Sequence, residues 1–425
     1  MTDKPQADAA QATLGRPAWL TAPSAVRVMD ALEAVGGPDC ARFVGGCVRN
    51  TLIGVKVDDV DIATRLTPER VTAALQAAGI KAVPTGIEHG TVTAVADHTP
   101  YEITTLRRDV TTDGRRATVA FTDDWAEDAG RRDFTLNSLY ARRDGSIFDP
   151  TGNGVDDARA GRIVFVGEPE QRLREDHLRS LRFFRFHAWY GKGPADAAAV
   201  AACAALKENI RSLAAERISK ELLKLLAADD PRDAVRLMAE TGVLEVILQT
   251  QADLARFDGL VEIESGQLFE ADAVLRLAAL LPADQTGALR LAERLRLSNA
   301  DRDRMVAALA PAPVLKSWMS PREIRQAVYR EGGKAFRDRA KLAWAAAKGS
   351  ASAMQWRGMI ALADGWTPPA FPLTGEDVIK AGAPKGPMVG EVLREVEAWW
   401  IDHDFIEDRL SAIEKLKAVV QGMVY

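Results

Sequence analysis

Cysteine and histidine are scarce in this sequence, and long apolar runs are missing. Among 425 residues there are three cysteines and five histidines. The cysteines (Cys40, Cys47 and Cys203) are scattered and odd in number, which argues against a disulfide framework and predicts a reducing, cytoplasmic location. Because no CxxC motif or Cys/His cluster is present, we expect no zinc site. No stretch approaches the ~18 apolar residues that a membrane span needs, so we expect no membrane contact.

The sequence also lacks an excess of positive charge. Its formal net charge is -5, which does not indicate nucleic-acid binding but does not exclude it, because a basic face can lie on an acidic protein. Arginines crowd between Arg107 and Arg185, where several alternate with aromatic or apolar residues, and this alternation favours a lined cleft over a loose basic tail. The first ~20 residues have neither the basic start nor the apolar run of a signal peptide.

Two different patterns divide the chain. Helical spacing at 24–36 and 67–79 alternates with strand-like runs at 90–97 and 101–109, which flank a turn at "DHTP". From residue 169 onward one helical window follows another, which predicts an elongated all-α region. The sequence thus predicts, in order, a flexible tail (1–23), a small α/β head with a mixed sheet (24–165), a helical neck (166–230) and a helical body and tail (231–425).

The stretch "FVGGCVRNTLIGVKVDDVDIAT" combines a glycine turn, an arginine and an acidic cluster. Residues two apart in a strand share a face, so Asp59 and Asp61 are predicted to form a platform for one or two magnesium ions, as phosphoryl transfer requires. Backbone N–H groups at Gly45-Gly46 can donate hydrogen bonds to phosphate oxygens, and the guanidinium of Arg49 can make a bidentate contact with a phosphate. Each feature alone is weak evidence, but together they favour a site that binds phosphate and a metal ion.

This stretch closely resembles the first motif of the class II tRNA nucleotidyltransferases, the CCA-adding enzymes, and of the related bacterial poly(A) polymerases. The family pattern is GGxVRD, then LLG, then DxDxxT, and this sequence departs from it at Asn50, where the family usually has Asp. The resemblance implies an α/β nucleotidyltransferase head. It also implies that Asp59 and Asp61 are the catalytic, magnesium-binding residues and that Gly46 and Arg49 bind the nucleotide.

A second segment, "RRDFTLN", resembles the family motif RRDFTxNA. Taken alone, these residues would form an ion-paired turn at a helix cap. In the family, this segment contacts the sugar and phosphates of the incoming nucleotide. The resemblance therefore implies that Arg132 binds the nucleotide, with Asp133 and Asn137 in support.

A third segment, "EDHLRSLRFFRF", resembles the family motif EDxxRxxRxxRF. Asp176 and Arg179 are three residues apart on a predicted helix, so an ordinary salt bridge would explain them. An aspartate can also accept from the amino group of cytosine or adenine while an arginine donates to the ring, which would reject uracil and guanine. The family uses this pair in place of a nucleic-acid template. Arg182 and Arg185 follow Arg179 at the same three-residue spacing and are expected to reach towards phosphate.

Two further segments resemble the family less decisively. "YEITTLRR" resembles the family strand "EVTTFR", in which Glu102 is either a third active-site carboxylate or a solvated strand residue. "AAERISKEL" resembles a helix that supports the base-reading helix, so Glu216 and Arg217 are interpreted as structural. Tryptophans of the C-terminal half, such as Trp344 and Trp356, are interpreted as core residues and not as base-stacking platforms.

Three ordered motifs imply an enzyme that adds C, C and A to the 3′ end of tRNA from CTP and ATP, without a template, with magnesium as cofactor. The neck would recognise the base and the body would bind RNA; no protein partner is implied. A poly(A) polymerase would share the head and the chemistry, but this chain lacks the strongly basic extension that those enzymes tend to carry. Variants that add only C-C or only A stay open.

Two other classes of protein are less consistent with the sequence. A phosphohydrolase with an HD domain would need a second His/Asp cluster, whereas the only His-Asp pair downstream of the motifs is His403-Asp404. A non-catalytic RNA-binding adaptor would have no need of intact Asp59 and Asp61. We therefore expect an enzyme.

Overall fold

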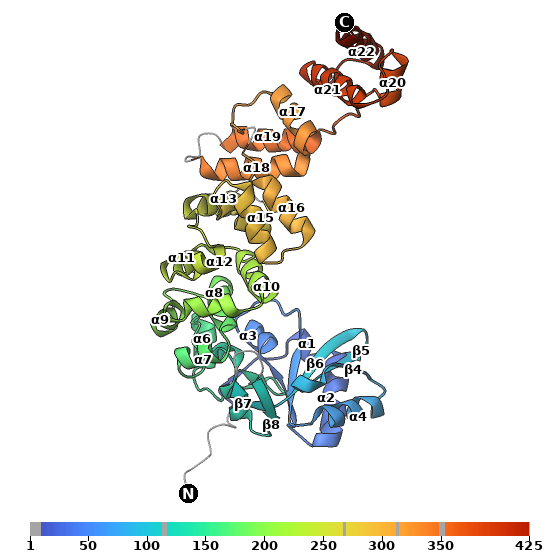
Figure 1. Ribbon diagram of the computed structural model, residues 1–425. Coiled ribbons are helices and arrows are strands. Elements are labelled where there is room, and N and C mark those ends of the chain that lie inside the picture. Colours follow the sequence, from blue (N-terminus) through green and yellow to red (C-terminus); the bar gives the residue numbers. More distant parts are fainter. Residues whose placement is uncertain (1–9, 113–116, 267–268, 312–313, 348–352, 425) are drawn as a thin grey trace. The chain divides into compact units, whose positions relative to one another are not determined.

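Contacts divide the chain into two compact units, Met1–Thr250 and Gln251–Tyr425. The first unit holds a mixed sheet with helices, and the described elements of the second unit are all helices (Figure 1). This confirms the predicted α/β head followed by a helical region, while the finer division at residues 165 and 230 stays a prediction. The computed structural model describes residues 10–112, 117–266, 269–311, 314–347 and 353–424.

The sheet of the first unit has eight strands in the order β1-β10-β9-β2-β3-β6-β5-β4. Strands β3 and β6 pair in parallel, and the other described neighbours pair antiparallel. Strands β7 (Arg107–Thr112) and β8 (Ala117–Phe121) form a separate two-stranded ribbon. The strands of the main sheet are β1 (Ala12–Thr13), β2 (Ala41–Val44), β3 (Asp61–Thr64), β4 (Lys81–Gly86), β5 (Thr91–Ala96), β6 (Thr99–Thr105), β9 (Tyr140–Ala141) and β10 (Ser146–Phe148).

Helices α2 (Pro23–Gly36) and α4 (Pro68–Ala77) pack against the sheet (Figure 1). Val92 and Ile103 point to the covered face and are at most 1% exposed, whereas Glu102 alternates to the other face and is exposed. The opposite face therefore carries the polar side chain of Glu102 beside β3. The other elements that form the site are α3 (Gly46–Leu52), α5 (Trp125–Gly130), η2 (Thr135–Asn137), α7 (Pro169–Glu175), α8 (Leu178–Tyr190) and α10 (Ala215–Leu226).

The structure corrects two predictions near the N-terminus. β3 begins at Asp61, so Asp59 precedes the strand as an exposed residue, and the prediction that both aspartates lie on one strand is wrong. The predicted flexible tail, 1–23, contains ordered elements. β1 pairs with β10 at the edge of the sheet, and α1 (Ala18–Thr21) follows; residues 1–9 lie outside the described residues.

The helix predicted to carry both Asp176 and Arg179 is broken in the structure. α7 ends before Asp176, which has an extended backbone (φ −151°), and α8 begins at Leu178. The break has a local cause, because the Asp176 carboxylate accepts a hydrogen bond from the N–H of Leu178 (3.1 Å). Such a side-chain bond satisfies a helix-start donor and competes with continuation of the preceding helix.

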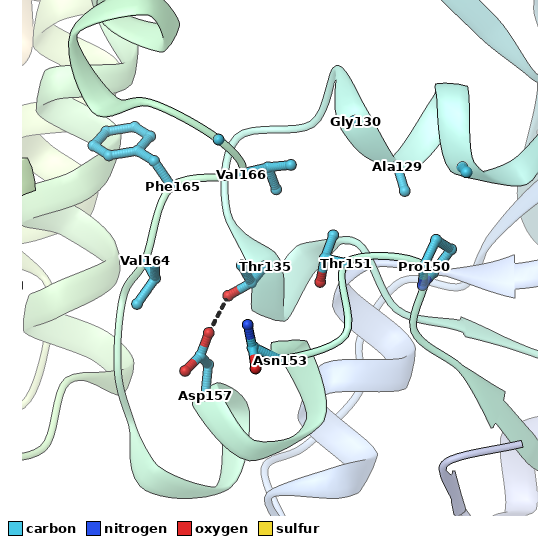
Figure 2. Close-up of a pocket in the computed structure, with 12 residues that line it drawn as sticks. Ala129, Gly130, Thr135, Pro150, Thr151, Asn153, Asp157, Val164, Phe165 and Val166 are labelled. Carbon is cyan, nitrogen blue, oxygen red and sulfur yellow. Dashed lines mark hydrogen bonds between the residues drawn. The ribbon is translucent and has the colours of Figure 1, made fainter. Parts of the chain in front are cut away.

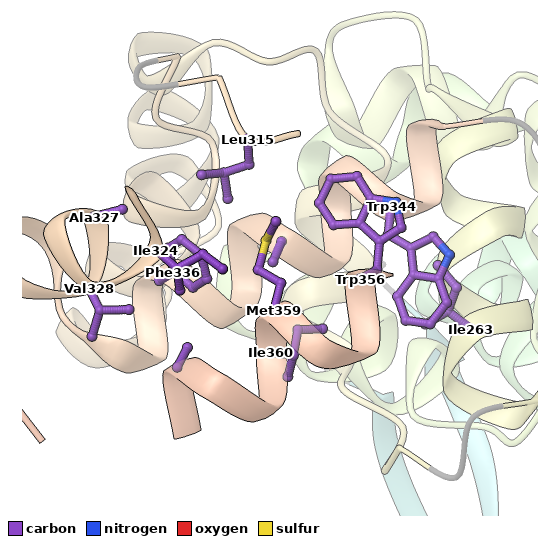
Figure 3. Close-up of a cluster of buried hydrophobic side chains, with 12 residues drawn as sticks. Ile263, Leu315, Ile324, Ala327, Val328, Phe336, Trp344, Trp356, Met359 and Ile360 are labelled. Atoms are coloured by element: carbon purple, nitrogen blue, oxygen red, sulfur yellow. The ribbon is translucent and has the colours of Figure 1, made fainter. Parts of the chain in front are cut away.

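The second unit buries two separate apolar clusters. One lies among α13 and α17–α19, where Figure 3 shows Trp344 and Trp356 beside Met359, and the other lies among α20–α22. Trp344 and Trp356 are at most 5% exposed, as expected of core residues. No helix among the described residues is long and apolar enough to cross a membrane. The helices around the two clusters are α13 (Leu254–Gly266), α17 (Pro321–Glu331), α18 (Gly333–Ala346), α19 (Ala353–Gly365), α20 (Gly375–Lys380), α21 (Pro387–Asp402) and α22 (Arg409–Val424).

A buried arginine anchors α5 to the sheet. Arg42, on β2, is 1% exposed, and its guanidinium carbon lies 4.3 Å from the centre of the Trp125 ring and 4.5 Å from that of Phe148. The guanidinium also pairs with Asp39 (Nη2 to Oδ2, 2.6 Å). Burial raises the pKa of Asp39, but Arg42 and Arg142 outweigh it and lower the value to about 2. A carboxylate and two aromatic faces thus replace the water that the buried cation loses.

Replacing Arg42 by methionine keeps much of its volume and removes the charge. We expect Arg42→Met to lower the free energy of unfolding of the first unit by about 3 kcal/mol, because Asp39 loses its buried partner. Urea denaturation followed by circular dichroism measures this loss. Arg143→Met is the matched control, because Arg143 pairs with Asp30 and Glu33 but is 36% exposed, so we expect less than about 1 kcal/mol. Equal losses in the two variants would contradict the anchoring role of Arg42.

Candidate active site

Carboxylates gather where β3 begins. Asp61 is the register partner of Glu102 in the parallel pair, so the two side chains leave the same face of adjacent strands. Burial raises the pKa of Asp61 to about 6, and the charges of Glu102 and Asp59 add to the rise, against the opposing effect of Arg132. The register thus brings beside Asp61 the glutamate whose role the sequence left open.

This group of carboxylates suits a divalent cation. Burial, together with the negative charges of Glu102 and Asp59, disfavours the ionised form of Asp61, which a cation would favour. Carboxylate oxygens are the hard donors that magnesium prefers. Among the described residues, no three or more His, Cys, Asp or Glu side chains are arranged as a complete metal site. Magnesium does not need one, because it binds through one or two carboxylates together with water and substrate phosphates. Asp59 and Asp61 therefore fit the predicted metal.

The glycine turn lies against Arg132. Gly45 is the N-cap of α3 and has a positive φ of 72°, a backbone conformation that favours glycine. A Cβ atom there would lie 3.8 Å from Nη1 of Arg132. The Gly45 N–H donates to the carbonyl of Leu139 (3.1 Å), which fixes the turn next to β9. Gly46 is the first residue of α3, so its N–H lies at the helix start, where anions are favoured.

Arg132 approaches the same region from the segment after α5. Its Nε and Nη2 donate to Oδ2 of Asp128 at 3.2 and 3.0 Å, and Nε also donates to the hydroxyl of Tyr140 at 3.2 Å. The positive charge of Arg132 lowers the pKa of Asp61, so it acts on the carboxylates directly. Three segments far apart in the sequence therefore converge: the glycine turn, the start of β3 and the arginine pair of the second motif.

A chain of buried polar side chains connects the first motif to α8. Nη1 of Arg49 donates to Oδ1 of Asn137, and Nδ2 of Asn137 donates to Oδ1 of Asp133 (3.0 Å). Nε of Arg182, on α8, donates to Oδ2 of Asp133 (2.8 Å). Burial raises the pKa of Asp133, but Arg182, Asn137 and the N–H of Phe134 together lower it below its usual range. The supporting residues Asp133 and Asn137 thus hold all three motifs together.

Arg49 lies behind the glycine turn and not in the open site. It is 6% exposed, and burial lowers its pKa. Its Nη2 donates to the hydroxyl of Tyr190 (3.0 Å) and to Oδ1 of Asn50 (2.8 Å). Nδ2 of Asn50 in turn donates to the carbonyl of Lys56 (2.8 Å), a bond that an ionised aspartate could not make. The predicted nucleotide contact of Arg49 stays a prediction, while its observed contacts support the turn.

Asp176 and Arg179 do not form the intrahelical pair that the spacing predicts. Because the helix breaks between α7 and α8, Asp176 pairs with Arg217 of α10 (2.8 Å). Arg179 pairs with Glu175 (2.6 Å) and donates to the carbonyl of Arg131 (3.0 Å). The two side chains are still adjacent, since the Arg179 N–H donates to the Asp176 carbonyl (3.0 Å). Their predicted role in base recognition is not tested by these contacts.

The remaining two arginines of α8 also have carboxylate partners. Arg182 pairs with Asp133, and Arg185 pairs with Glu221 of α10 (Nε to Oε2, 2.6 Å). The side chain of Arg182 is 32% exposed and that of Arg185 is 18% exposed. Arg179, Arg182 and Arg185 therefore each pair with a carboxylate from a different element. Their contact with nucleotide phosphate stays a prediction.

Sequence reasoning missed several residues that support the site. Asp128 lies four residues before Arg132, a helical spacing that could have revealed their pairing. Glu175 likewise precedes Arg179 by four residues. Tyr140 and Tyr190 gave no sequence signal, because they come from segments that only the tertiary fold brings to Arg132 and Arg49.

A hollow of about 280 Å³ lies behind the second motif (Figure 2). Gly130 and Thr135, which flank Arg132, line it together with Asn153 and Val166. Thr135 donates to Oδ2 of Asp157 at the base of the hollow (2.7 Å). None of the predicted site residues lines this hollow, so we do not assign the nucleotide to it.

Comparison with known proteins extends the likeness over most of the chain. Residues 41–164 match the family model described as "Poly A polymerase head domain", and residues 196–254 match "Probable RNA and SrmB- binding site of polymerase A". The mitochondrial CCA tRNA nucleotidyltransferase 1 of Mus musculus is 34% identical over 372 residues, which cover 84% of this chain and 82% of that protein. The CCA-adding enzyme of Levilactobacillus brevis is 30% identical over 379 residues, 87% and 91% of the two chains.

A solved structure agrees with these sequence relatives. The crystal structure of the Bacillus stearothermophilus CCA-adding enzyme in complex with CTP is similar with a TM-score of 0.74 and 26% identity. The similarity covers 96% of this chain and 99% of that one. Sequence, domain order and fold therefore agree along nearly the whole length, and the chain belongs to the family of CCA tRNA nucleotidyltransferases.

Proposed function

We propose that this protein adds C, C and A to the 3′ end of tRNA, using CTP and ATP and releasing pyrophosphate. The observation that carries the proposal is the convergence of Asp61, the Gly45 turn and Arg132 at one edge of β3. Relatives that share at least 30% identity over more than four fifths of the chain are named for CCA addition. The CTP complex of a similar structure supports a nucleoside triphosphate as substrate.

The residues of the chain bind and align the two substrates. The N–H of Gly46 and the guanidinium of Arg132 hold the triphosphate and ribose, and Arg49 supports the turn through Asn137. The 3′-hydroxyl of the tRNA attacks the α-phosphate, and pyrophosphate leaves from the opposite side. Most of the acceleration comes from alignment and charge neutralisation.

Magnesium is part of this proposal, with Asp59 and Asp61 as its protein ligands. A bound magnesium ion would lower the pKa of the attacking hydroxyl and neutralise charge on the triphosphate. Its charge would also relieve the repulsion that Asp61 experiences from Asp59 and Glu102. Glu102 lies where a third carboxylate could accept the proton of the attacking group or assist metal binding.

Base selection is assigned to Asp176 and Arg179 at the junction of α7 and α8. Their polar groups suit the edges of cytosine and adenine. Arg182 and Arg185 lie further along α8, and in this proposal they contact the phosphates. The helical region would recognise tRNA by shape and phosphate contacts. The family match at residues 196–254, described as an RNA-binding segment, supports RNA binding by this part of the chain. The three buried free cysteines support a reducing, cytoplasmic location.

The direct test uses purified protein, magnesium and a tRNA transcript that lacks its 3′ CCA. With CTP and ATP together we expect growth by C-C-A that then stops, as read by sequencing the products. Asp61→Ala is the matched control and should abolish incorporation while tRNA affinity stays nearly unchanged, because the carboxylate acts on the reacting groups and not on the tRNA body. A long A tract from ATP alone would indicate a poly(A) polymerase instead. Addition of only C-C or only A would indicate a specialised variant, and tRNA binding without incorporation would indicate an adaptor.

The raised pKa of Asp61 predicts the pH dependence of the reaction. Below pH about 6 the carboxyl becomes protonated in the metal-free protein, so the affinity for magnesium and the rate of single-nucleotide addition should fall as pH falls through that value. Glu102→Gln removes a negative neighbour and should move the inflection to lower pH. Rates at subsaturating magnesium between pH 5 and 8 measure the shift. Glu88→Gln, an exposed carboxylate on η1 (Ile87–His89), is the control; an inflection that Glu102→Gln leaves in place would contradict this account.

Removal of the Asp176 carboxylate should damage base choice more than chemistry. For Asp176→Ala we expect the preference for C and A over U and G to fall by at least about tenfold, because one hydrogen bond to the base amino group is lost. Competition between pairs of nucleotides in single-turnover reactions measures the preference. Arg217→Ala is a useful comparison, because it removes the partner of Asp176 and keeps the carboxylate. An unchanged preference in Asp176→Ala would exclude base reading by this residue.

A further inference from the structure

Asp128 is the most heavily hydrogen-bonded carboxylate near the site, and no role has been assigned to it so far. It lies on α5 and is 1% exposed. Oδ1 accepts from Nε (3.0 Å) and Nη2 (2.7 Å) of Arg131 and from the N–H of Arg107 (3.2 Å). Oδ2 accepts from Nε (3.2 Å) and Nη2 (3.0 Å) of Arg132 and from the hydroxyl of Tyr140 (2.6 Å). The two oxygens are thus divided between the two arginines of the second motif.

Two cations and a hydroxyl compensate this buried charge. Burial alone would raise the pKa of Asp128, but Arg132, Arg131 and Tyr140 together hold it well below its usual range. The carboxylate is therefore ionised near neutral pH. A buried, ionised carboxylate with paired donors is a rigid reference point, because moving either guanidinium away would leave a charge without partners.

The bond geometry orients the free end of Arg132. Asp128 engages Nε and Nη2, so Nη1 is the nitrogen directed away from the pair. Nη1 lies beside the Gly45 turn, and among the described residues no acceptor bonds to it. The same guanidinium lowers the pKa of Asp61. Asp128 thus aims one donor of Arg132 into the space between the glycine turn and the carboxylates.

The other oxygen of Asp128 acts on the base-reading side of the site. Arg131 is held by its bonds to Asp128 and by a bond from its Nε to the carbonyl of Arg107 (3.0 Å). The carbonyl of Arg131 accepts a hydrogen bond from Nη2 of Arg179 (3.0 Å). One carboxylate therefore links the arginine proposed for the triphosphate to the arginine proposed for the base.

We propose that Asp128 is a positioning residue for nucleotide binding, an inference that rests on the proposed function and extends it. Asp128 does not touch the nucleotide. It holds Arg132 with one oxygen so that Nη1 meets the triphosphate, and it holds Arg131 with the other so that the Arg131 carbonyl sets the place of Arg179. Loss of its charge frees both arginines at once, which weakens binding of CTP and of ATP alike.

The test is Asp128→Asn in the full-length protein, with CTP affinity measured by calorimetry in the absence of RNA. The amide keeps the shape but puts an N–H₂ group against a guanidinium, so we expect the Kd for CTP and the KM for both nucleotides to rise by about tenfold. The affinity for tRNA without CCA should stay within about twofold, because the helical region is untouched. A normal CTP affinity in Asp128→Asn would overturn the proposal.

Two controls separate positioning from general destabilisation. Glu264→Gln neutralises a carboxylate that is equally buried and paired with Arg276 in the second unit, so it should lower Tm while CTP affinity is unchanged. Equal loss of CTP affinity in Glu264→Gln and Asp128→Asn would overturn the proposal. Tyr140→Phe is a milder variant for use if Asp128→Asn does not fold, and it should raise the Kd for CTP by about threefold, since one of the donors to Asp128 is removed. An unchanged Kd in Tyr140→Phe would also count against the role of Asp128.

A double-mutant cycle tests whether Asp128 acts through Arg132. In an Arg132→Met background, Asp128→Asn should raise the Kd for CTP by much less than it does in the wild type, because its main target is gone. Full additivity would show that Asp128 acts by another route and would overturn the proposal. If the wild-type protein itself neither binds CTP nor incorporates it, the proposed function fails; if the wild type is active and Asp128→Asn binds CTP normally, only the present inference fails.

Discussion

The site depends on the burial of one charged network, Arg49–Asn137–Asp133–Arg182. Its members come from three parts of the chain: Arg49 from α3, Asn137 and Asp133 from the second motif, and Arg182 from α8. A buried carboxylate or guanidinium without a partner is strongly unfavourable, so the network is complete only when all three segments are in register. This constraint places the glycine turn opposite Arg132 and places α8 beside both. The candidate site is therefore a product of charge compensation as much as of apolar packing.

Local charge balance differs on the two sides of the site. The arginines of α8 and of the second motif each have an acid within the protein, so their positive charge is largely compensated before a nucleotide arrives. At the start of β3, burial raises the pKa of Asp61, and the negative charges of Glu102 and Asp59 raise it further. A substrate that brings phosphates together with a divalent cation supplies both signs of charge at once. Under the proposed function, this distribution of charge suits a nucleotide that carries its divalent cation.

The sequence predicted most of what local motifs and periodicity can encode. The mixed head and the turn between β5 and β6 followed from composition and spacing, and the family followed from the resemblance of the three motifs, whose residue roles stay predictions. One error lies where a single side chain decides the backbone. Asp176 stops α7 by accepting the N–H of Leu178, a choice that helical spacing does not reveal. The burial of Arg49 by Tyr190 is likewise invisible, since it depends on contacts across more than a hundred residues of chain.

The parallel pairing of β3 with β6 can keep the geometry of the site while the surrounding sequence changes. The distance between the Asp61 and Glu102 backbones is the interstrand spacing, about 4.8 Å in any sheet, whatever residues surround them. A slip of one residue in the pairing would turn one carboxylate to the buried face. The site therefore depends on the register of the two strands more than on which residues surround the two carboxylates. The juxtaposition of the two carboxylates therefore requires few specific residues. The fold itself is shared with a solved structure at a TM-score of 0.74 and 26% identity, so most residue identities can differ while the fold is kept.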